Sequence, residues 1–326
     1  MRVIRGYRLP EGTSTVLTLG NFDGVHLGHR ALFARLRKVG HALNLPTLVL
    51  TFEPHPREFF SPKQVPARLS VLREKLEHFA DAGVDICCVC RFDATFAALS
   101  AQDFIDQVLV DALDVRHIIV GDDFRFGARR VGDFQLLQSA GQTRGFGVEA
   151  LEPISVTCQR VSSSAVRAAL DKGDMVTAEA LLGRPYMMDG RVVHGDKIGR
   201  SLGFATANLR VKHAPLPLAG VFCVTVRGSS ERWHHHFGER ALQGVANLGT
   251  RPTARGVRTM LEIHLFDFDA DIYGEHLSVY FRRRLREEQR FPDFDALKRQ
   301  IAADIQEARS FFRQSVARSL TQSPHC

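Results

Sequence analysis

The chain has 326 residues and a formal net charge of +7, and 44% of its residues are hydrophobic. This length allows two domains, each with its own core, and the composition is that of an ordinary globular protein. No apolar run approaches the roughly 20 residues that a helix needs to cross a bilayer, and no apolar segment follows the basic start of the chain. We therefore expect neither a membrane span nor a secretory signal.

The six cysteines lack the spacing of a disulfide framework or a zinc site. Three of them, Cys87, Cys88 and Cys90, fall within one strand-like run. On a strand, Cys88 and Cys90 would share one face and serve as small core residues. This usage of cysteine predicts a protein of the reducing cytoplasm.

The positive charge could indicate a nucleic-acid partner. The densest basic run, from Arg282 to Arg290, is interrupted by Leu285, Glu287 and Glu288. We interpret it as a solvated segment that partly forms a site for small molecules, and we expect no nucleic-acid partner. The composition leaves the oligomeric state open.

The first 150 residues alternate between strand-like and helix-like patterns. Apolar residues at helical spacing, such as Leu32, Leu36, Val39 and Leu43, separate short apolar runs. The strand-like runs are 16–22, 47–52, 84–90 and 115–121. Such alternation predicts a doubly wound parallel sheet, in which ligands bind beyond the carboxyl ends of the strands.

The pattern changes in the second half of the chain. Residues 162–183 are typical of two short helices and a linker. Short segments rich in β-branched and aromatic residues then predict an antiparallel barrel. The stretch from Phe294 to Phe312 returns to helical spacing, with Leu297, Ile301, Ile305 and Ala308 on one stripe. We expect domains at 1–182 and 183–326, the second ending in this helix and a loose tail.

The first candidate site is the segment 20–29, GNFDGVHLGH, where a strand ends and a helix begins. The free N–H groups of a helix start favour phosphate, His26 and His29 can add donors, and Gly28 lets the backbone approach closely. The tetrapeptide HxGH alone is equally consistent with two surface histidines. Three further segments, 51–56, 121–127 and 161–167, strengthen the prediction of a phosphate site, because the first two follow strands and the third starts a helix.

The second candidate site begins with glycines at every fourth position. Gly195, Gly199 and Gly203 could form a loop that approaches phosphates, although barrel turns would also use glycine, and the segment is not a Walker A sequence. Thr206 and Asn208 follow with neutral oxygen atoms suited to Mg²⁺ and phosphate.

Glu262 lies in a strand-like run, where it would share a face with His264, with Leu261 and Ile263 on the other face. A carboxylate on a rigid strand can activate a hydroxyl for attack on phosphorus. An ordinary exposed face of an antiparallel sheet is the alternative interpretation.

With these motifs in order, the chain resembles the bacterial bifunctional riboflavin kinase/FMN adenylyltransferase family, also called FAD synthetase. The resemblance rests on HxGH, GDDFRFG and SSSAVR in the first half and on GRPY, TAN, GVANLGTRPT and LEIHLFDF in the second. It implies an N-terminal HxGH nucleotidyltransferase domain and a C-terminal riboflavin kinase barrel. The implied reactions use ATP and Mg²⁺ to convert riboflavin to FMN, and then FMN to FAD with release of pyrophosphate.

The resemblance also implies roles for residues of the first half. His26 and His29 would contact the phosphates of ATP, and Arg167 would belong to a phosphate-binding motif and act in catalysis. The binding positions carried over are Asn21, Phe22, Asp23, Gly24, Gly28, Pro54, His55, Pro56, Asp123, Phe124, Phe126, Ser162 and Ser163.

In the second half, the resemblance implies that Glu262 is the general base. It also implies that Thr206 and Asn208 bind Mg²⁺ and the phosphates of ATP. The nucleotide loop would contain Gly195, Lys197, Gly199 and Gly203, and the flavin side would contain Arg286 and Glu288. The departures from the family pattern include Ala205, which replaces a proline, Phe222, which replaces a tyrosine, and Gln289 and Arg290, which replace a segment that often carries lysine.

Two alternatives accompany this interpretation. One domain could work while the other is degenerate, or the folds could serve a flavin- or RNA-binding regulatory protein without catalysis.

The run Trp233–His236 could bind metal, but consecutive histidines cannot all face one ion, and we expect a hairpin loop there. We expect His117 to be structural, and Met187 and Met188 to be packing or loop residues.

Overall fold

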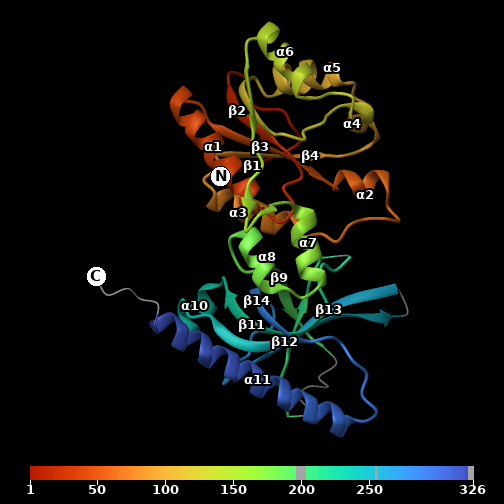
Figure 1. Ribbon diagram of the computed structural model, residues 1–326, viewed down its shortest axis with the longest axis vertical. Coiled ribbons are helices and arrows are strands. Elements are labelled where there is room, and N and C mark those ends of the chain that lie inside the picture. Colours follow the sequence, from red (N-terminus) through yellow and green to blue (C-terminus); the bar gives the residue numbers. More distant parts are fainter. Residues whose placement is uncertain (196–202, 214, 254–255, 322–326) are drawn as a thin grey trace. The chain divides into compact units, whose positions relative to one another are not determined.

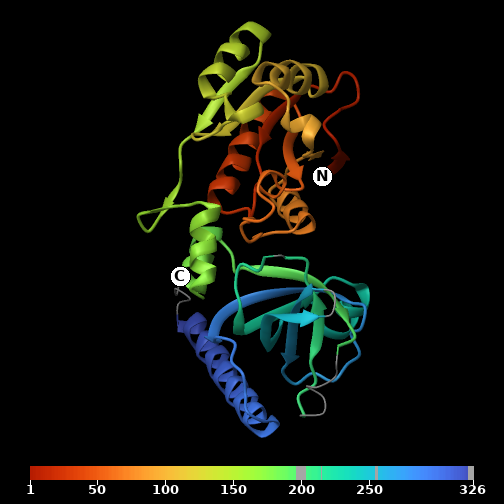
Figure 2. The ribbon, with the colours of Figure 1, turned by 90° about the vertical axis from the view of Figure 1, so that its right-hand side faces the viewer.

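The computed structural model of the protein describes residues 1–195, 203–213, 215–253 and 256–321. The chain divides into two compact units, Met1–Ser163 and Ser164–Cys326 (Figures 1 and 2). The domain boundary expected between residues 182 and 183 stays a prediction.

The first unit contains a six-stranded sheet in the order β1-β4-β3-β2-β5-β6, and every neighbouring pair is parallel. Its strands are β1 (Arg2–Arg5), β2 (Thr15–Leu19), β3 (Thr47–Glu53), β4 (Ile86–Arg91), β5 (Val115–Gly121) and β6 (Gly147–Leu151). The chain runs from β2 through β3 to β4 and then crosses to β5 on the other side of β2. This reversal creates a switch point at the carboxyl ends of β2 and β5, which is where such sheets bind ligands.

Helices cover both faces of this sheet. They are α1 (Leu27–Leu43), α2 (Pro56–Phe60), α3 (Leu72–Asp81), α4 (Ala94–Ala97), α5 (Ala101–Asp103), the π-helix η1 (Phe104–Ala112), the 3₁₀-helix η2 (Ala128–Arg130) and α6 (Phe134–Arg144). Phe33 of α1 and Phe79 of α3 pack on one face of the sheet, and Ile105 of η1 and Leu137 of α6 pack on the other. The predicted doubly wound arrangement is confirmed. A small hairpin follows, formed by β7 (Ser155–Val156) and β8 (Gln159–Arg160).

The cysteines of β4 behave as the alternation of a strand requires. Cys88 and Cys90 belong to the same core cluster, whereas Cys87 belongs to the cluster on the opposite face. Burial raises the pKa of the Cys88 thiol to about 11, so that the thiol stays protonated near neutral pH. These cysteines are core residues, as the sequence predicted.

The second unit is a closed antiparallel barrel in the order β10-β13-β12-β11-β14-β9, preceded by two short helices. The elements are α7 (Ser163–Asp171), α8 (Met175–Leu182), β9 (Met187–Val193), β10 (Ala207–Arg210), β11 (Gly220–Gly228), α10 (Glu231–Phe237), β12 (Leu242–Thr253), β13 (Gly256–Leu265), β14 (His276–Arg286) and α11 (Phe294–Thr321). The predicted barrel and the predicted terminal helix are both confirmed. Met187 and Met188 lie on β9 and are buried, so they are packing residues.

The barrel has an apolar interior, where Phe222 and Phe281 meet edge to face with ring centroids 5.2 Å apart. Phe222 is fully buried there, so the hydroxyl that a tyrosine would add has no polar role at this position. Helix α11 lies along the outside of the barrel (Figures 1 and 2). Its Ala308 and Phe312 form a cluster with Cys223 of β11, and Val245 of β12 packs against that cluster.

The expectation of a hairpin loop at the histidine run is wrong, because residues 231–237 form helix α10. Ser230 caps this helix by accepting a hydrogen bond from the N–H of Trp233 at 3.0 Å. The helical turn buries Trp233 against Phe237, with ring centroids 4.8 Å apart, and leaves the histidines exposed. In the part of the chain that the structure describes, no three His, Cys, Asp or Glu side chains gather as a metal site would require.

Candidate active sites

The segment predicted to bind phosphate leaves β2 at its carboxyl end and enters α1. His26 is the N-cap of α1, and its Nδ1 accepts a hydrogen bond from the N–H of His29 at 3.4 Å. The two imidazole rings stack, with centroids 3.6 Å apart and an interplanar angle of 18°. The turn into the helix therefore brings both histidines together at the helix start, as the sequence predicted.

The loop between β2 and α1 is held by contacts from distant parts of the first unit. The carboxylate of Asp23 accepts hydrogen bonds from the N–H groups of Leu69 at 3.1 Å and Ser70 at 3.0 Å. The hydroxyl of Ser163 donates to the carbonyl of Asp23 at 2.9 Å. Asp23 and Ser163 thus fix the loop itself, and any contact that they make with a nucleotide stays a prediction.

The tight course of this loop depends on glycine. Gly24 has a φ of +82°, and a Cβ there would lie 2.8 Å from Cδ1 of Leu69. A Cβ on Gly28 would lie 3.2 Å from the ring of His26. Phe22 also has a positive φ, of 47°, and is buried edge-on against His29 with ring centroids 5.2 Å apart. The buried ring of Phe22 therefore packs against His29 and limits the movement of its imidazole.

Two polar side chains beside this loop, those of Asn21 and Lys75, have buried polar atoms or are buried themselves. The Oδ1 atom of Asn21 is buried and has no hydrogen-bond partner among the described residues. Lys75 of α3 is only 3% exposed, and its Nζ donates to the carbonyl of Asn21 at 3.4 Å. Burial lowers the pKa of Lys75, while the carboxylates of Glu53 and Asp23 act in the opposite direction. Nothing in the sequence of α3 marks Lys75 as a buried residue of this site.

The segment 54–56 follows β3 at the same edge of the sheet. His55 is the N-cap of α2, and Pro56 is the first residue of that helix. Arg68 ties the start of α2 to the end of β3, because its guanidinium binds Glu53 at 2.7 Å and also binds Glu58. The contact of these residues with flavin stays a prediction.

The segment after β5 lies beside the loop after β2, because β2 and β5 are neighbours. Phe124 and Phe126 stack with ring centroids 5.4 Å apart, and the side chain of Asp123 is exposed. Ser162 is half-buried just before α7. Arg167 lies on α7 in the second unit, and its role in phosphate binding stays a prediction.

In the barrel, strand register builds the second candidate site. Asn208 of β10 is the register partner of Glu262 of β13, and Glu262 is the partner of Asn247 of β12. The same row continues through Val221 of β11 to Arg286 of β14. Three residues predicted from separate motifs therefore lie on one line across the barrel, and Asn247 stands between them.

This row lies on the outer face of the barrel. Val245, two residues before Asn247, packs toward α11, and alternate residues of a strand share a face. The intervening Leu209, Leu248 and Leu261 are fully buried on the opposite face. The predicted division of β13 into a polar face with Glu262 and an apolar face is confirmed.

Two predicted residues outside the strands reach this row. A Cβ on Gly195 would lie 2.3 Å from Nδ2 of Asn208, so the carboxamide fills the space that glycine leaves open. A Cβ on Gly249 would lie 1.9 Å from the carboxylate of Glu288, which therefore stands over β12. Gly195 thus lies against the Asn208 end of the row, and Glu288 stands over β12 at Gly249, two residues from Asn247.

Other predicted residues are placed as follows. Thr206 is half-buried directly before β10, and the carbonyl of the preceding Ala205 lies 2.9 Å from Nδ1 of His264. Arg286 binds the carboxylate of Asp304 on α11, with Nη2 and Oδ2 2.8 Å apart. Gly203 is exposed, and Lys197 and Gly199 lie outside the described residues.

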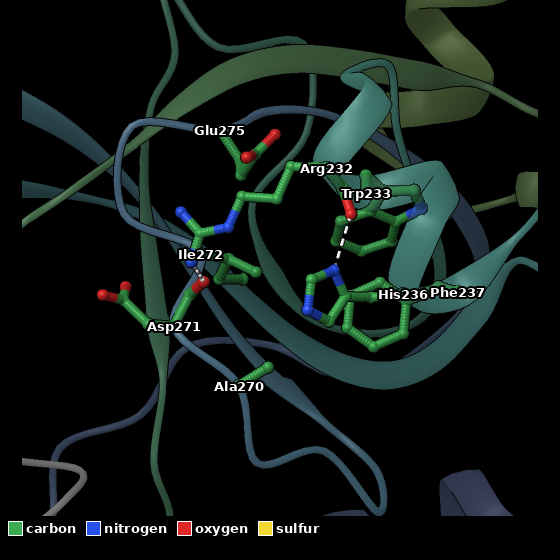
Figure 3. Close-up of a pocket in the computed structure, with 8 residues that line it drawn as sticks. All are labelled: Arg232, Trp233, His236, Phe237, Ala270, Asp271, Ile272 and Glu275. Atoms are coloured by element: carbon green, nitrogen blue, oxygen red, sulfur yellow. Dashed lines mark hydrogen bonds between the residues drawn. The ribbon is translucent and has the colours of Figure 1, made fainter.

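A separate small hollow of about 70 Å³ lies in the second unit between α10 and the loop 270–275. Figure 3 shows Trp233, Phe237 and His236 along one side of it and Ile272 on the other. Its eight lining residues, all of them described, include no residue predicted for either site: Arg232, Trp233, His236, Phe237, Ala270, Asp271, Ile272 and Glu275.

Comparison with known proteins identifies a different family in each half of the chain. The sequence model of the FAD synthetase family matches residues 9–165, and that of riboflavin kinase matches residues 182–312. The bifunctional riboflavin kinase/FMN adenylyltransferase of Escherichia coli K12 is 49% identical over 315 residues, which cover 96% of this chain and 98% of that protein. The enzyme of the same name from Haemophilus influenzae is 46% identical and covers 96% of this chain and 99% of its own length.

The chain belongs to the bifunctional riboflavin kinase/FMN adenylyltransferase family. The FAD synthetase match contains the histidine pair and the segments after β3 and β5, and the riboflavin kinase match contains the whole polar row of the barrel. A crystal structure named as a macrolide-efflux protein from Streptococcus pneumoniae is also similar, with a TM-score of 0.79 and 29% identity, covering 93% of this chain and 97% of that one. In the described ranges, no helix of this family member is long and apolar enough to cross a membrane.

Proposed function

We propose that the chain phosphorylates riboflavin with ATP to give FMN and then adenylylates FMN with a second ATP to give FAD. One observation carries this proposal: each half of the chain has its own polar site, and each site lies within the match to the corresponding family. A protein that only bound flavin would need neither a histidine pair at a helix start nor a carboxylate in the middle of a strand row.

Adenylyl transfer is assigned to the first unit. A phosphate oxygen of FMN attacks the α-phosphorus of ATP, the bond from that phosphorus to the bridging oxygen of the β-phosphate breaks, and pyrophosphate leaves. The N–H groups at the start of α1 and the imidazoles of His26 and His29 would stabilise the charge that grows on the phosphates. The reaction needs no covalent intermediate with the protein.

Riboflavin phosphorylation is assigned to the barrel. Glu262 would accept the proton of the ribityl 5′-hydroxyl while that oxygen attacks the γ-phosphorus of ATP, and ADP leaves as the bond to the bridging oxygen breaks. The position of Glu262 between two carboxamides on a rigid sheet supports this role, because a strand holds a base more firmly than a loop.

Mg²⁺ fits the residues at the nucleotide end of the row. Thr206 and Asn208 offer neutral oxygen atoms, and the carboxamide of Asn208 fills the space that Gly195 leaves open. We infer that these two residues hold Mg²⁺ together with the phosphates of ATP. When bound, the ion would neutralise phosphate charge.

Small molecules are the expected partners, and the cytoplasm is the expected compartment. The basic run at the end of β14 is largely paired with acids, since Arg283 lies 3.1 Å from Glu307 and Arg286 binds Asp304. Such pairing leaves less positive charge for a nucleic acid. The cysteines of the described chain are free thiols, which suits a reducing compartment.

A single incubation tests the proposal. The purified protein is mixed with riboflavin, ATP and Mg²⁺, and the flavins are separated by chromatography over time. We expect FMN to form first and FAD to follow. Folded protein that makes neither flavin would overturn the proposal and favour a binding role. Formation of FAD from supplied FMN, but of no FMN from riboflavin, would indicate a degenerate barrel.

A further inference from the structure

Asn247 occupies the centre of the polar row. It lies in the segment GVANLGTRPT, which contributes to the family resemblance, but the sequence predicted no role for it. It is the register partner of Glu262 on one side and of Val221 on the other, and Val221 is in turn the partner of Arg286. Opposite residues of an antiparallel pair have Cβ atoms about 5 Å apart. The side chain of Asn247 is therefore a direct neighbour of the candidate base.

The carboxamide of Asn247 has an unmet hydrogen-bonding capacity. Its Oδ1 atom is buried and has no hydrogen-bond partner in the described part of the chain. Buried acceptors are nearly always paired, because leaving one unpaired costs free energy that the fold does not recover. An unpaired acceptor in the middle of a polar row therefore points to a donor that arrives with a ligand.

The surroundings limit where that ligand lies. Along β12, Val245 is covered by the cluster on α11, and Gly249 lies beneath the carboxylate of Glu288. Across the sheet, Glu262 separates Asn247 from Asn208, the residue at the nucleotide end. Asn247 thus belongs to the side of the row away from the expected Mg²⁺ and toward Glu288.

The groups that meet at the reacting centre decide between the two substrates, because the donors of ATP, its ribose hydroxyls and its adenine amino group, lie away from the γ-phosphate. An amide oxygen needs a hydrogen-bond donor. The phosphate groups of ATP present only acceptors when ionised, so they offer nothing to Oδ1. The ribityl chain of riboflavin carries several hydroxyl groups, one of which is the nucleophile that Glu262 would deprotonate.

We propose that Oδ1 of Asn247 accepts a hydrogen bond from a ribityl hydroxyl of riboflavin and so positions the 5′-hydroxyl against Glu262. This inference rests on the proposed kinase activity of the barrel. It makes Asn247 a determinant of flavin binding and of selectivity for the ribityl chain, with no part in ATP binding.

The first test replaces Asn247 with leucine, which has a similar volume and no acceptor. We expect kcat/KM for riboflavin to fall about 10- to 100-fold, while the KM for ATP stays within about twofold. Asn247→Asp keeps an acceptor oxygen and should retain more of the riboflavin selectivity than leucine. Gln243→Leu, at an exposed position on the same face of β12, is the matched control and should leave both parameters unchanged.

The second test removes the donor instead of the acceptor, using riboflavin analogues that each lack one ribityl hydroxyl. For the wild-type protein, one analogue should be a poorer substrate by a factor close to that of the leucine variant. In Asn247→Leu the same analogue should be used as well as riboflavin, because the bond is already lost. A purely structural role for Asn247 would not produce this coupling.

The outcomes separate this inference from the proposed function. Wild-type protein that forms no FMN contradicts the kinase activity. Wild-type protein that forms FMN, together with a leucine variant of unchanged riboflavin kinetics or a raised KM for ATP, overturns only the role of Asn247. Formation of FAD from supplied FMN reports on the folding of the first unit, and circular dichroism compared with the wild type reports on the folding of the whole chain. If the leucine variant does not fold, the aspartate variant and the analogue series on wild-type protein decide.

Discussion

The two units build their sites in opposite ways. In the first unit, loops at the carboxyl ends of parallel strands carry the site, and the residues of its centre are neighbours in sequence, from Asn21 to His29. In the barrel, the site is a row of strand residues that are far apart in sequence, and closure of the sheet aligns Asn208, Asn247 and Glu262. A site whose residues are adjacent in sequence can be recognised as a motif. A site whose residues come from different strands can be assembled only when the pairing register of those strands is known.

The two sites also differ in what holds them. Buried charged side chains hold the site of the first unit. The carboxylate of Asp23 accepts hydrogen bonds from backbone N–H groups, and Lys75 lies almost fully buried beside the loop. In the barrel row, the carboxylate of Glu262 stands between the neutral carboxamides of Asn208 and Asn247. We therefore expect changes at the buried charged residues of the first unit to affect stability and its pH dependence, in addition to any effect on catalysis, and changes at the carboxamides of the barrel to affect mainly catalysis.

The largest expected effect is that of Glu262→Gln. Losing a general base should lower FMN formation about 10²- to 10⁴-fold, while FAD formation from supplied FMN continues. Glu307→Gln, an exposed carboxylate on α11, is the control and should change neither rate. Chromatography of the flavins measures both reactions, and loss of both in a folded Glu262→Gln protein would end the assignment of separate sites.

His29→Ala should have the reverse effect. Removing one group that stabilises the transferring phosphates lowers rates about 10²- to 10³-fold, so FAD formation should fall by that factor and FMN formation should stay unchanged. His41→Ala, on an exposed position of the same helix, provides the comparison. Equal effects of the two substitutions on FAD formation would show that the histidine pair is not the site.

A pair of glycine substitutions sharpens the comparison further. A Cβ on Gly195 would overlap the carboxamide of Asn208 at 2.3 Å, whereas a Cβ on Gly28 would press on the ring of His26 at 3.2 Å. Because displacing a reacting group by about 1 Å can cost about 10²-fold, Gly195→Ala should reduce FMN formation by up to that factor. Gly28→Ala should reduce FAD formation less. Initial rates of the two reactions in both variants test the order, and the reverse order would contradict it.

The smallest expected effect concerns Lys75. Its pKa is lowered by burial, so the folded protein disfavours the charged ammonium, whereas the unfolded chain binds that proton up to a pKa of 10.5. Lys75→Met should therefore raise stability near neutral pH, by on the order of 1 kcal/mol, with a small loss of adenylyl transfer. The gain should shrink as the pH rises toward 10.5, because stability of the wild type then increases.

Urea denaturation of wild type and variant between pH 7 and about pH 10 measures this difference. Lys38→Met, at an exposed position on α1, should show no such trend. A stability difference for Lys75→Met that does not depend on pH would mean that the ammonium is not desolvated.

The sequence by itself predicted much of the first unit. Strand and helix periods predicted the parallel sheet, and the rule that carboxyl ends of parallel strands share one edge predicted where His26, Asp123 and the segment 54–56 would meet. The same periods predicted the barrel and the polar face of Glu262. Local patterns are sufficient to place these motifs, because the end of a strand fixes the position of the residues that directly follow it.

Tertiary structure alone decided the rest. The sequence did not reveal that Lys75 is buried, that Asp23 holds its own loop, that residues 231–237 are helical, or that Asn247 stands beside Glu262. Each depends on which distant segment covers a residue or pairs with it. Strand pairing and burial are set by the closing of the whole unit, and a shift of one residue in register would have turned Asn247 into the barrel core.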